Sequence, residues 1–289
     1  MNVDKLKFDA TRLCLAFLMF GKVLFAAQDF WDGANYALNS APQHESALQI
    51  LENLDILPTD HILDVGCGSG DISAFIATLV PLGHVQGLDL SESMVAFAKQ
   101  RKRSIANLSF CQQDIQAWNG EAGSFNHVVA FNVLQWVQDL NKALNNISQS
   151  LKPNGSFVAL LAHKDHFLYP FLIATALSEK WASYFNNPLQ DPWYGGNEED
   201  MHSRLCEAGL KPISVKQVSR KAHFDHWDDF INWTIAWFNS VTHMQQLPER
   251  ERRFFFLDCL ENYRSSVIFN LDGSFDLEYP LLVVKAVKS

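Results

Sequence analysis

A glycine-rich segment carries the clearest chemical signal in the sequence: Asp64-Val65-Gly66-Cys67-Gly68-Ser69-Gly70. It lies between residues 61–65, which are predicted as a strand, and residues 72–80, which are predicted as a helix. Glycines at such a turn let the backbone bend sharply and approach a ligand closely. Asp89 ends the next predicted strand, where an acid can accept hydrogen bonds from both hydroxyls of a ribose. These residues predict a nucleoside-binding site.

Two classes of cofactor could use this turn. A dinucleotide site has the pattern Gly-x-Gly-x-x-Gly, with a pyrophosphate at the helix N-terminus. Here Gly70 comes one residue early, and Asp71 stands where that pattern has glycine. Asp64 adds a carboxylate at the mouth of the loop, which repels a pyrophosphate but suits the ammonium of an amino acid. S-adenosylmethionine (SAM) has that ammonium, a ribose and an adenine but no phosphate, so the charges favour SAM. A glycine-rich turn that binds nothing is the remaining alternative.

The segments around this turn alternate between strand-like and helix-like runs. Strands are predicted at 61–65, 84–88, 108–111, 127–131 and 156–161, and helices at 47–54, 72–80 and 140–151, with another that Ser91 caps and that carries Met94. Such alternation predicts βαβ units and a parallel sheet with helices on both faces. We therefore expect an α/β fold with a Rossmann-like, doubly wound core.

Aromatic-rich helical segments follow residue 163, including a helix from Pro248 to Tyr263. Further strands are predicted at 213–218 and 281–287, which would bring the sheet to seven strands. We expect residues 1–46 to form an N-terminal lid segment, residues 47–163 the SAM-binding core, and residues 164–289 a helical cap with the final strands.

Four motifs resemble, in order, those of class I SAM-dependent methyltransferases. They are Ile62 to Gly70, Gly87 to Ser91, Gln113-Asp114-Ile115 and Phe131-Asn132. The resemblance implies that the acid of the third motif accepts from the adenine amine, and that its apolar neighbour covers the ring. It also implies that the fourth motif holds the methionine end of SAM. The cofactor-binding residues expected on this basis are Asp64, Gly66, Cys67, Gly68, Gly70, Asp89, Leu90, Met94, Asp114, Ile115, Phe131 and Asn132.

A narrower resemblance concerns the methyl acceptor. Trp31-Asp32, Tyr36, Asn39-Ser40 and Gln43, with Leu134-Gln135-Trp136-Val137 further on, are similar to trans-aconitate and juvenile-hormone-acid methyltransferases. The malonyl-carrier methyltransferases share the Gln-Trp pair, and all these enzymes esterify carboxylates. The resemblance implies that Gln43 and Trp136 contact the substrate acid, while Gln135 stands where many members have histidine.

Methylation of a carboxylate suits these residue types. A carboxylate is already ionised at neutral pH, so it needs alignment, dehydration and hydrogen-bond donors rather than a base. Trp136 offers one N–H donor and Gln43 offers two. A phenol or amine acceptor is the alternative, with His163 or His166 as base. A non-catalytic SAM-binding scaffold is another, and Trp136 could be core packing while Gln43 merely caps or solvates a helix.

Composition limits the partners. The chain has 289 residues and a formal net charge of −9. Because the sequence has no cationic stripe, we do not expect it to bind nucleic acid. Five cysteines without a Cys-x-x-Cys pair predict neither disulfides nor a zinc ribbon. His163/His166 and His223/His226 lack a clear third ligand, so no metal is expected. The sequence does not predict an oligomeric state.

Localisation depends on the N-terminal residues. Lys5, Lys7 and Arg12 precede an apolar run at 13–21, which is too short to span a bilayer. The pattern fits a helix that packs on the domain of a cytoplasmic protein. The alternative is a secreted protein in which residues 1–27 are a cleaved signal.

Overall fold

The computed structural model describes residues 29, 31–120, 122–185, 196–238, 244 and 246–289. The possible signal at residues 1–27 and most of the predicted lid segment lie outside the described residues. Within the part of the chain that is described, no helix is long and apolar enough to cross a membrane.

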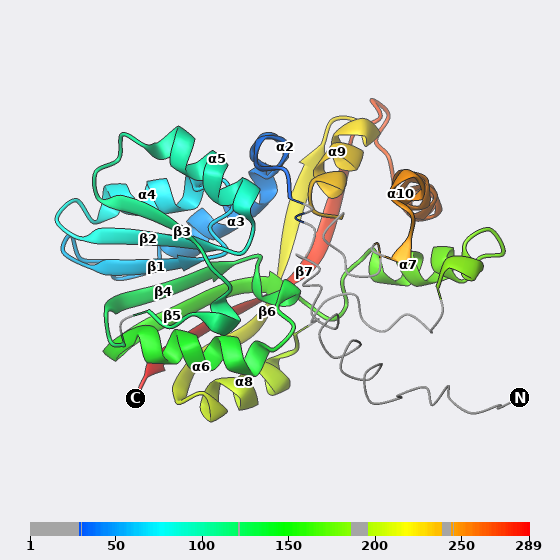
Figure 1. Ribbon diagram of the computed structural model, residues 1–289. Helices are drawn as coiled ribbons and strands as arrows, with labels where there is room; N and C mark the ends of the chain where they lie inside the picture. Colours follow the sequence, from blue (N-terminus) through cyan, green and yellow to red (C-terminus); the bar gives the residue numbers. More distant parts are fainter. Residues whose placement is uncertain (1–28, 30, 121, 186–195, 239–243, 245) are drawn as a thin grey trace, which may run out of the picture.

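A seven-stranded sheet forms the centre of the molecule, in the order β3-β2-β1-β4-β5-β7-β6 (Figure 1). Strands β1 to β5 are parallel, and β7 pairs antiparallel with both β5 and β6. Their bounds are β1 His61–Val65, β2 His84–Asp89, β3 Leu108–Gln112, β4 Phe125–Phe131, β5 Leu151–Ala162, β6 Leu210–Phe224 and β7 Phe275–Lys288. The predicted α/β, Rossmann-like sheet of seven strands is confirmed.

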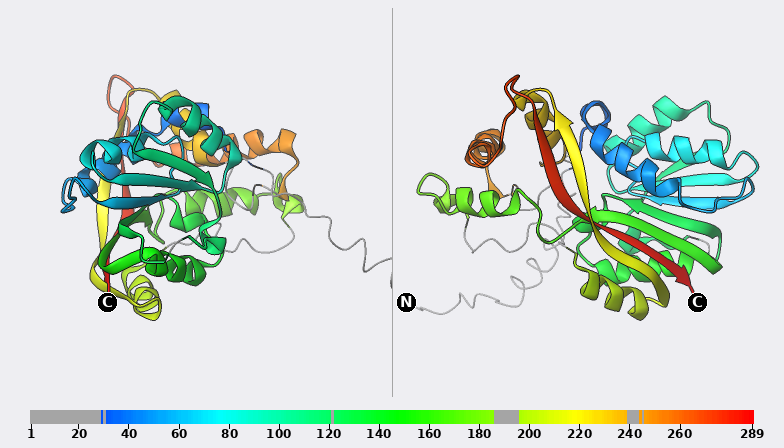
Figure 2. Two further views of the ribbon diagram at one scale, coloured as in Figure 1. Left: turned by 60° about the vertical axis from the view of Figure 1, so that its left-hand side comes forward. Right: turned by 180° about the vertical axis from the view of Figure 1, so that it is seen from behind.

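The last two strands are much longer than predicted. Their hydrogen bonds run from Leu210, opposite Lys288, to Phe224, opposite Phe275, and they extend beyond the other strands toward the C-terminal helices (Figure 2). Many side chains of the edge strand β6 are exposed. The predicted ranges cover only part of each strand: 213–218 lies in the first two thirds of β6, and 281–287 lies toward the C-terminal end of β7.

Helices cover both faces of the sheet (Figure 1). On one side lie α3 (Ala41–Leu51), α4 (Asp71–Leu79) and α5 (Glu92–Lys102), and on the other α6 (Leu140–Ser150) and α8 (Glu198–Glu207). The predicted stripe on α6 is confirmed, since Leu140, Ala143, Leu144 and Ile147 are all buried. The buried residues accordingly form two hydrophobic clusters.

Helix α3 begins six residues earlier than predicted, at Ala41 instead of residue 47. Pro42 lies in its first turn, a position where proline fits because the missing N–H would have no partner there. The early start matters because it places Gln43 inside the first turn of a helix.

Four further helices lie near the extended part of β6 and β7. They are α2 (Gly33–Asn39), α7 (Tyr169–Ala176), α9 (Trp227–Phe238) and α10 (Glu249–Arg264). Helix α10 confirms the prediction for 248–263, and Pro248 is its N-cap residue. Helix α9 contacts α2, and its Trp233 is hydrogen-bonded to Gln43 of α3, so segments about 190 residues apart in sequence meet.

Candidate active site

The glycine turn has the backbone geometry that its sequence predicts. Gly66, Gly68 and Gly70 have φ angles of 72°, 51° and 77°, in the region that favours glycine. A Cβ on Gly66 would also overlap the side chain of Val133. The N–H of Gly66 donates to the carbonyl of Leu88 at 2.6 Å, which holds the turn against the end of β2.

Asp89 faces this turn from the end of β2. Its Oδ2 accepts from the backbone N–H of Gly68 and its Oδ1 from that of Ser91, both at 2.9 Å. Burial raises the pKa of Asp89, against the effect of these two bonds. Each carboxylate oxygen retains a lone pair, so the carboxylate can still accept from two ribose hydroxyls, which fits the expected nucleoside.

Asp64 lies in β1, just before the turn, and only 2% of it is exposed. Its Oδ2 accepts from the hydroxyl of Ser73 at 2.6 Å. Burial raises the pKa of Asp64 to about 7, and the charge of Asp89 adds to this shift. No cation among the described residues pairs with Asp64 or Asp89. The site therefore suits a positively charged ligand group better than a diphosphate.

Tyr36 brings helix α2 over the same turn. A Cβ on Gly68 would lie 3.5 Å from the ring of Tyr36. Burial raises the pKa of the Tyr36 phenol, as do the nearby charges of Asp89 and Asp64. The segment before α2 is held to α5, because Asp29 accepts from the hydroxyl of Ser91 at 2.8 Å. Tyr36 thus lies between the glycine turn and the pocket described below.

Asp114 is half-buried, and the side-chain NH2 of Gln116 donates to both its oxygens at 3.1 Å, whereas Leu90 is well exposed. Asp114 caps the short helix η1 (Ile115–Ala117), where its Oδ1 accepts from the N–H of Gln116 at 2.8 Å. Leu90 is 63% exposed, so it can cover an adenine ring.

The other expected cofactor residues are less exposed. Met94, Ile115, Cys67 and Phe131 are buried, and burial raises the pKa of the Cys67 thiol, which argues against a nucleophilic role. Asn132 has a φ of 55°, and its N–H donates to the carbonyl of Leu160 at 2.7 Å. This unusual conformation occurs at the carboxyl end of β4, where it turns the chain toward the pocket.

A pocket with about 630 Å³ of empty space, part of it open to solvent, lies beside the turn. None of its described lining residues is Asp, Glu, Lys or Arg, and most are aromatic or apolar. The described lining consists of Trp31, Tyr36, Gln43, Ser46, Asn132, Gln135, Trp136, Ala162, His166, Trp233, Trp237, Tyr279 and Leu281.

Both expected acceptor residues, Gln43 and Trp136, line this pocket. The Oε1 of Gln43 accepts from the indole N–H of Trp233 at 2.9 Å. An indole N–H can only donate, so this bond fixes the carboxamide with its NH2 directed elsewhere. Trp136 packs edge-to-face on Trp31, with ring centroids 6.2 Å apart, and tilted on Trp237, at 6.5 Å.

His166 was one of the two candidate bases, and its surroundings weaken that role. Burial lowers the pKa of His166 to about 3, so the imidazole is neutral across the physiological range. A base with so low a pKa is poorly matched to a phenol or an ammonium. His163, the other candidate, is buried and does not line the pocket; its ring nitrogens lie 3.4 Å from Asp165 and 3.8 Å from Glu198.

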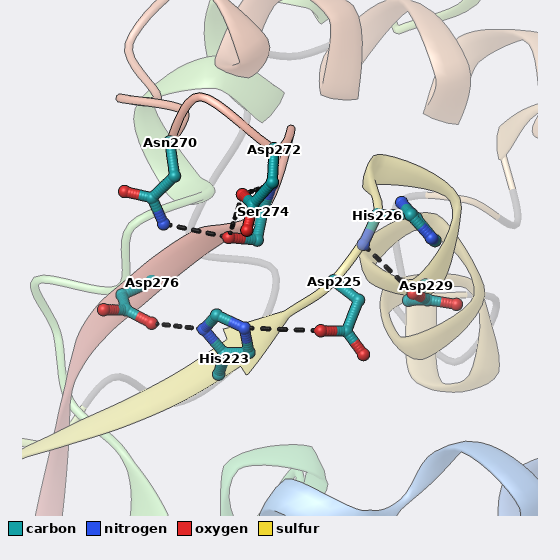
Figure 3. A network of polar contacts seen from close by, with 8 residues as sticks. All are labelled: His223, Asp225, His226, Asp229, Asn270, Asp272, Ser274 and Asp276. Carbon is teal, nitrogen blue, oxygen red and sulfur yellow. Dashed lines mark hydrogen bonds and ion pairs between the residues drawn. The ribbon is translucent and has the colours of Figure 1, made fainter.

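The second histidine pair lies in a polar network near the end of β6 (Figure 3). His223 lies between Asp276, at 2.7 Å, and Asp225, at 3.4 Å, and the bond to Asp276 raises the pKa of His223. His226 is engaged separately, since its backbone N–H donates to Asp229 at 3.1 Å. Among the described residues, no group of three or more His, Cys, Asp or Glu could hold a metal ion.

Sequence reasoning missed several residues of the pocket. Trp233, Trp237 and Tyr279 come from α9 and β7, where aromatic residues are usual in a core and give no separate signal. Gln135 was noted only as a departure from histidine. Its position in η2 (Leu134–Trp136), next to Trp136, was the available indication.

Comparison with known proteins shows the family of this chain. Residues 56–200, half of the chain, match the family described as methyltransferase domain. Trans-aconitate 2-methyltransferase of Shigella flexneri serotype 5b is 22% identical over 261 residues, which cover 89% of this chain and 97% of that protein. Juvenile hormone acid O-methyltransferase of Drosophila melanogaster is 32% identical over 133 residues, covering 44% and 45% of the two chains.

A solved structure shares the fold. Phosphoethanolamine N-methyltransferase 2 of Haemonchus contortus, in complex with S-adenosyl-L-methionine, superimposes with a TM-score of 0.53 at 19% identity. The match covers 84% of this chain and 52% of that chain.

Proposed function

The chain belongs to the methyltransferase domain family and is a methyltransferase, and from this we propose that it transfers the methyl group of SAM to the carboxylate of a small or medium, partly apolar acid. The product would be the methyl ester of that acid. Two features support the proposal: the charges around the glycine turn and the hydrogen-bond donors of the pocket.

The residues around the turn fit SAM. Asp64 and Asp89 are carboxylates without a paired cation among the described residues, so an ammonium group would be attracted there. Asp89 has free lone pairs for the ribose hydroxyls, Oδ2 of Asp114 keeps a lone pair beside the bond from Gln116, and Leu90 is exposed, so both could contact the adenine. When bound, SAM supplies an electrophilic methyl group on its sulfonium.

The orientation of Gln43 carries the proposal for the acceptor. Because Trp233 holds the carboxamide oxygen, the two N–H donors of Gln43 remain for a ligand, and no described residue accepts from them. Two fixed donors in a pocket whose described lining has no acidic side chain match the oxygens of a carboxylate. An ammonium would find no carboxylate among the described lining residues.

The reaction then needs no proton transfer. One carboxylate oxygen forms a bond to the methyl carbon while the bond from that carbon to sulfur breaks and its electron pair stays on sulfur. Trp136, Trp31 and Trp237 would exclude water from the acid, which leaves the attacking oxygen poorly hydrated. The neutral state of His166 fits this chemistry, since no base is required.

A product screen tests the proposal directly. Purified protein with SAM is incubated with carboxylic acids, phenols and amines, and product masses are recorded. Methyl esters are the expected products. Turnover confined to phenols or amines would contradict the proposal, and failure of SAM to bind in calorimetry would favour a scaffold.

Gln43→Glu separates an acid from an amine acceptor. The glutamate keeps an oxygen for the bond from Trp233 but replaces the donor NH2 with a negatively charged oxygen. We expect kcat/KM for an acid to fall by about 100-fold, because a charged repulsion replaces a charge-assisted hydrogen bond. An increase in kcat/KM for an amine would reverse the assignment.

Trp233→Phe tests whether the position of Gln43 matters. Loss of the indole N–H should raise KM for the acid about three- to tenfold, since one hydrogen bond contributes about 1 kcal/mol. Trp118→Phe is the matched control: it also loses an indole bond, 3.0 Å long to the hydroxyl of Ser150, but Trp118 does not line the pocket. Equal KM effects of the two substitutions would contradict a positioning role for Trp233.

A further inference from the structure

Gln135 leaves a polar atom unpartnered beside the pocket. The residue is only 7% exposed, and its Oε1 is buried with no hydrogen-bond partner among the described residues. Gln135 nevertheless lines the same pocket as Gln43. The two carboxamides therefore differ: the oxygen of Gln43 is bound by Trp233, whereas no described residue fixes the amide of Gln135.

An unpartnered buried carbonyl is costly. The unmet hydrogen bond of such a group costs about 1–3 kcal/mol, and folded proteins contain few of them. Because Gln135 lines the pocket, a turn of its side chain that brings Oε1 to the pocket surface would let a donor on the ligand remove this cost. The carboxylate of the acceptor cannot serve, because it has no proton to donate at neutral pH. The donor must belong to another group of the same molecule.

We propose that the acceptor is a hydroxy acid whose hydroxyl donates to Oε1 of Gln135 while its carboxylate is held by Gln43. This inference rests on the proposed function. A hydroxyl fits better than an ammonium because no described lining residue is acidic. It also fits either orientation of the Gln135 amide, since a hydroxyl can both donate and accept.

The remaining surface of the pocket indicates the chemical character of the rest of the acceptor. Trp31, Trp136, Trp233 and Trp237 line the pocket and present mainly hydrocarbon surface. The class of acceptor is thus an acid with a predominantly apolar chain and one hydroxyl. A site built to bind a hydroxyl discriminates against the analogue that lacks it, because the buried partner is then left unpaired.

The test compares kcat/KM for a medium-length straight-chain fatty acid with kcat/KM for each of its monohydroxy positional isomers. We expect at least one isomer to exceed the parent acid by about tenfold or more, as expected for one restored buried hydrogen bond. Gln135→Met has a similar shape without the amide, and it should bring this ratio close to one. Gln49→Met, on the exposed side of α3, is the control and should keep the wild-type ratio.

Gln135→Glu provides a second variant. It keeps an acceptor oxygen but adds a negative charge, so it should lower kcat/KM for all acids while the preference for the hydroxy isomer persists. Because the readout is a ratio between two substrates, a general loss of stability would not change it. Melting temperature and SAM affinity are measured for each variant to confirm that it is folded.

Three outcomes would overturn the inference. The first is a ratio near one for every isomer with the wild-type protein, although acids are methylated. The second is a hydroxyl preference that survives in Gln135→Met. The third is an absence of turnover with every carboxylic acid, which would overturn the proposed function as well and is distinguished from the first by the missing esters.

Discussion

Asp89→Asn is the most direct test of the proposed cofactor site. In the structure each oxygen of Asp89 accepts one backbone N–H, from Gly68 or from Ser91, at 2.9 Å. The expected ribose hydroxyls would use the remaining lone pairs. Asparagine replaces one oxygen by an NH2 group, which cannot accept and which would face a backbone N–H. One hydrogen bond to a charged group is therefore lost on the ribose side.

The loss of such a bond costs about 1.5–3 kcal/mol, so SAM should bind roughly 10- to 150-fold more weakly. Asp89→Ala should weaken binding by at least about tenfold on the same grounds. Isothermal titration calorimetry with SAM measures both affinities. Because the turn itself also loses a partner, melting temperature is measured in parallel, and the titrations are run well below it.

Asp55→Asn is the matched control, since Asp55 is exposed and bonds to no described residue. It makes the same change in charge far from the turn, and SAM affinity should stay at the wild-type value. If Asp89→Asn and Asp89→Ala both bound SAM as tightly as the wild type, Asp89 would have no part in binding the ribose, and the reasoning from its lone pairs would be refuted.

Three further predictions concern the turn and the pocket. Gly66→Ala should lower the free energy of unfolding, measured by chemical denaturation, by about 2–5 kcal/mol, because the backbone is strained and the new Cβ overlaps Val133. The control is Gly123→Ala, which should lower the free energy of unfolding only by the backbone strain, because the nearest heavy atom to its Cβ would be 4.0 Å away. Burial raises the pKa of Asp64 to about 7 in the free protein, and an ammonium beside it would lower that pKa. Binding of SAM near pH 6 should therefore release a proton, and the affinity should increase as the pH rises toward 7. Calorimetry in buffers of different ionisation heat measures the proton release, and a release that persists in Asp64→Asn would exclude Asp64 as its source. Trp136→Ala should lower kcat for the acid by about tenfold while the Kd of SAM changes less than about threefold; equal losses would make Trp136 structural or cofactor-facing.

The cofactor half of the site could be predicted because it is local in sequence. The strand, turn and helix around Gly66 are contiguous, and β1 is buried on both faces, which gives its sequence a continuous apolar character. Asp89 follows at the end of the adjacent strand. A short stretch of the sequence therefore includes nearly all the residues that form the turn and face it.

The acceptor pocket could be predicted only in part, because it depends on contacts between distant segments. The bond from Trp233 to Gln43 joins residues 190 positions apart, and no spacing in the sequence indicates it. The burial of Gln135 and the missing partner of its side-chain oxygen likewise depend on residues distant in sequence, so neither could be inferred from its neighbours in the chain. The second half of β6 is poor in apolar residues, so its extent also depends on pairing with β7. The first half of β7 does carry a signal that the prediction missed, since Phe275, Leu277 and Tyr279 alternate with exposed acids.

The position of β7 has a consequence for synthesis. This strand follows all the others in the sequence, yet it lies between β5 and β6 in the sheet. While a ribosome is still translating β7, the emerging polypeptide leaves one side of β5 without its neighbour, and β6 has no strand to join. Such unpaired edges are prone to aggregation. Nascent chains arrested just before residue 275 should therefore be the ones most dependent on chaperones.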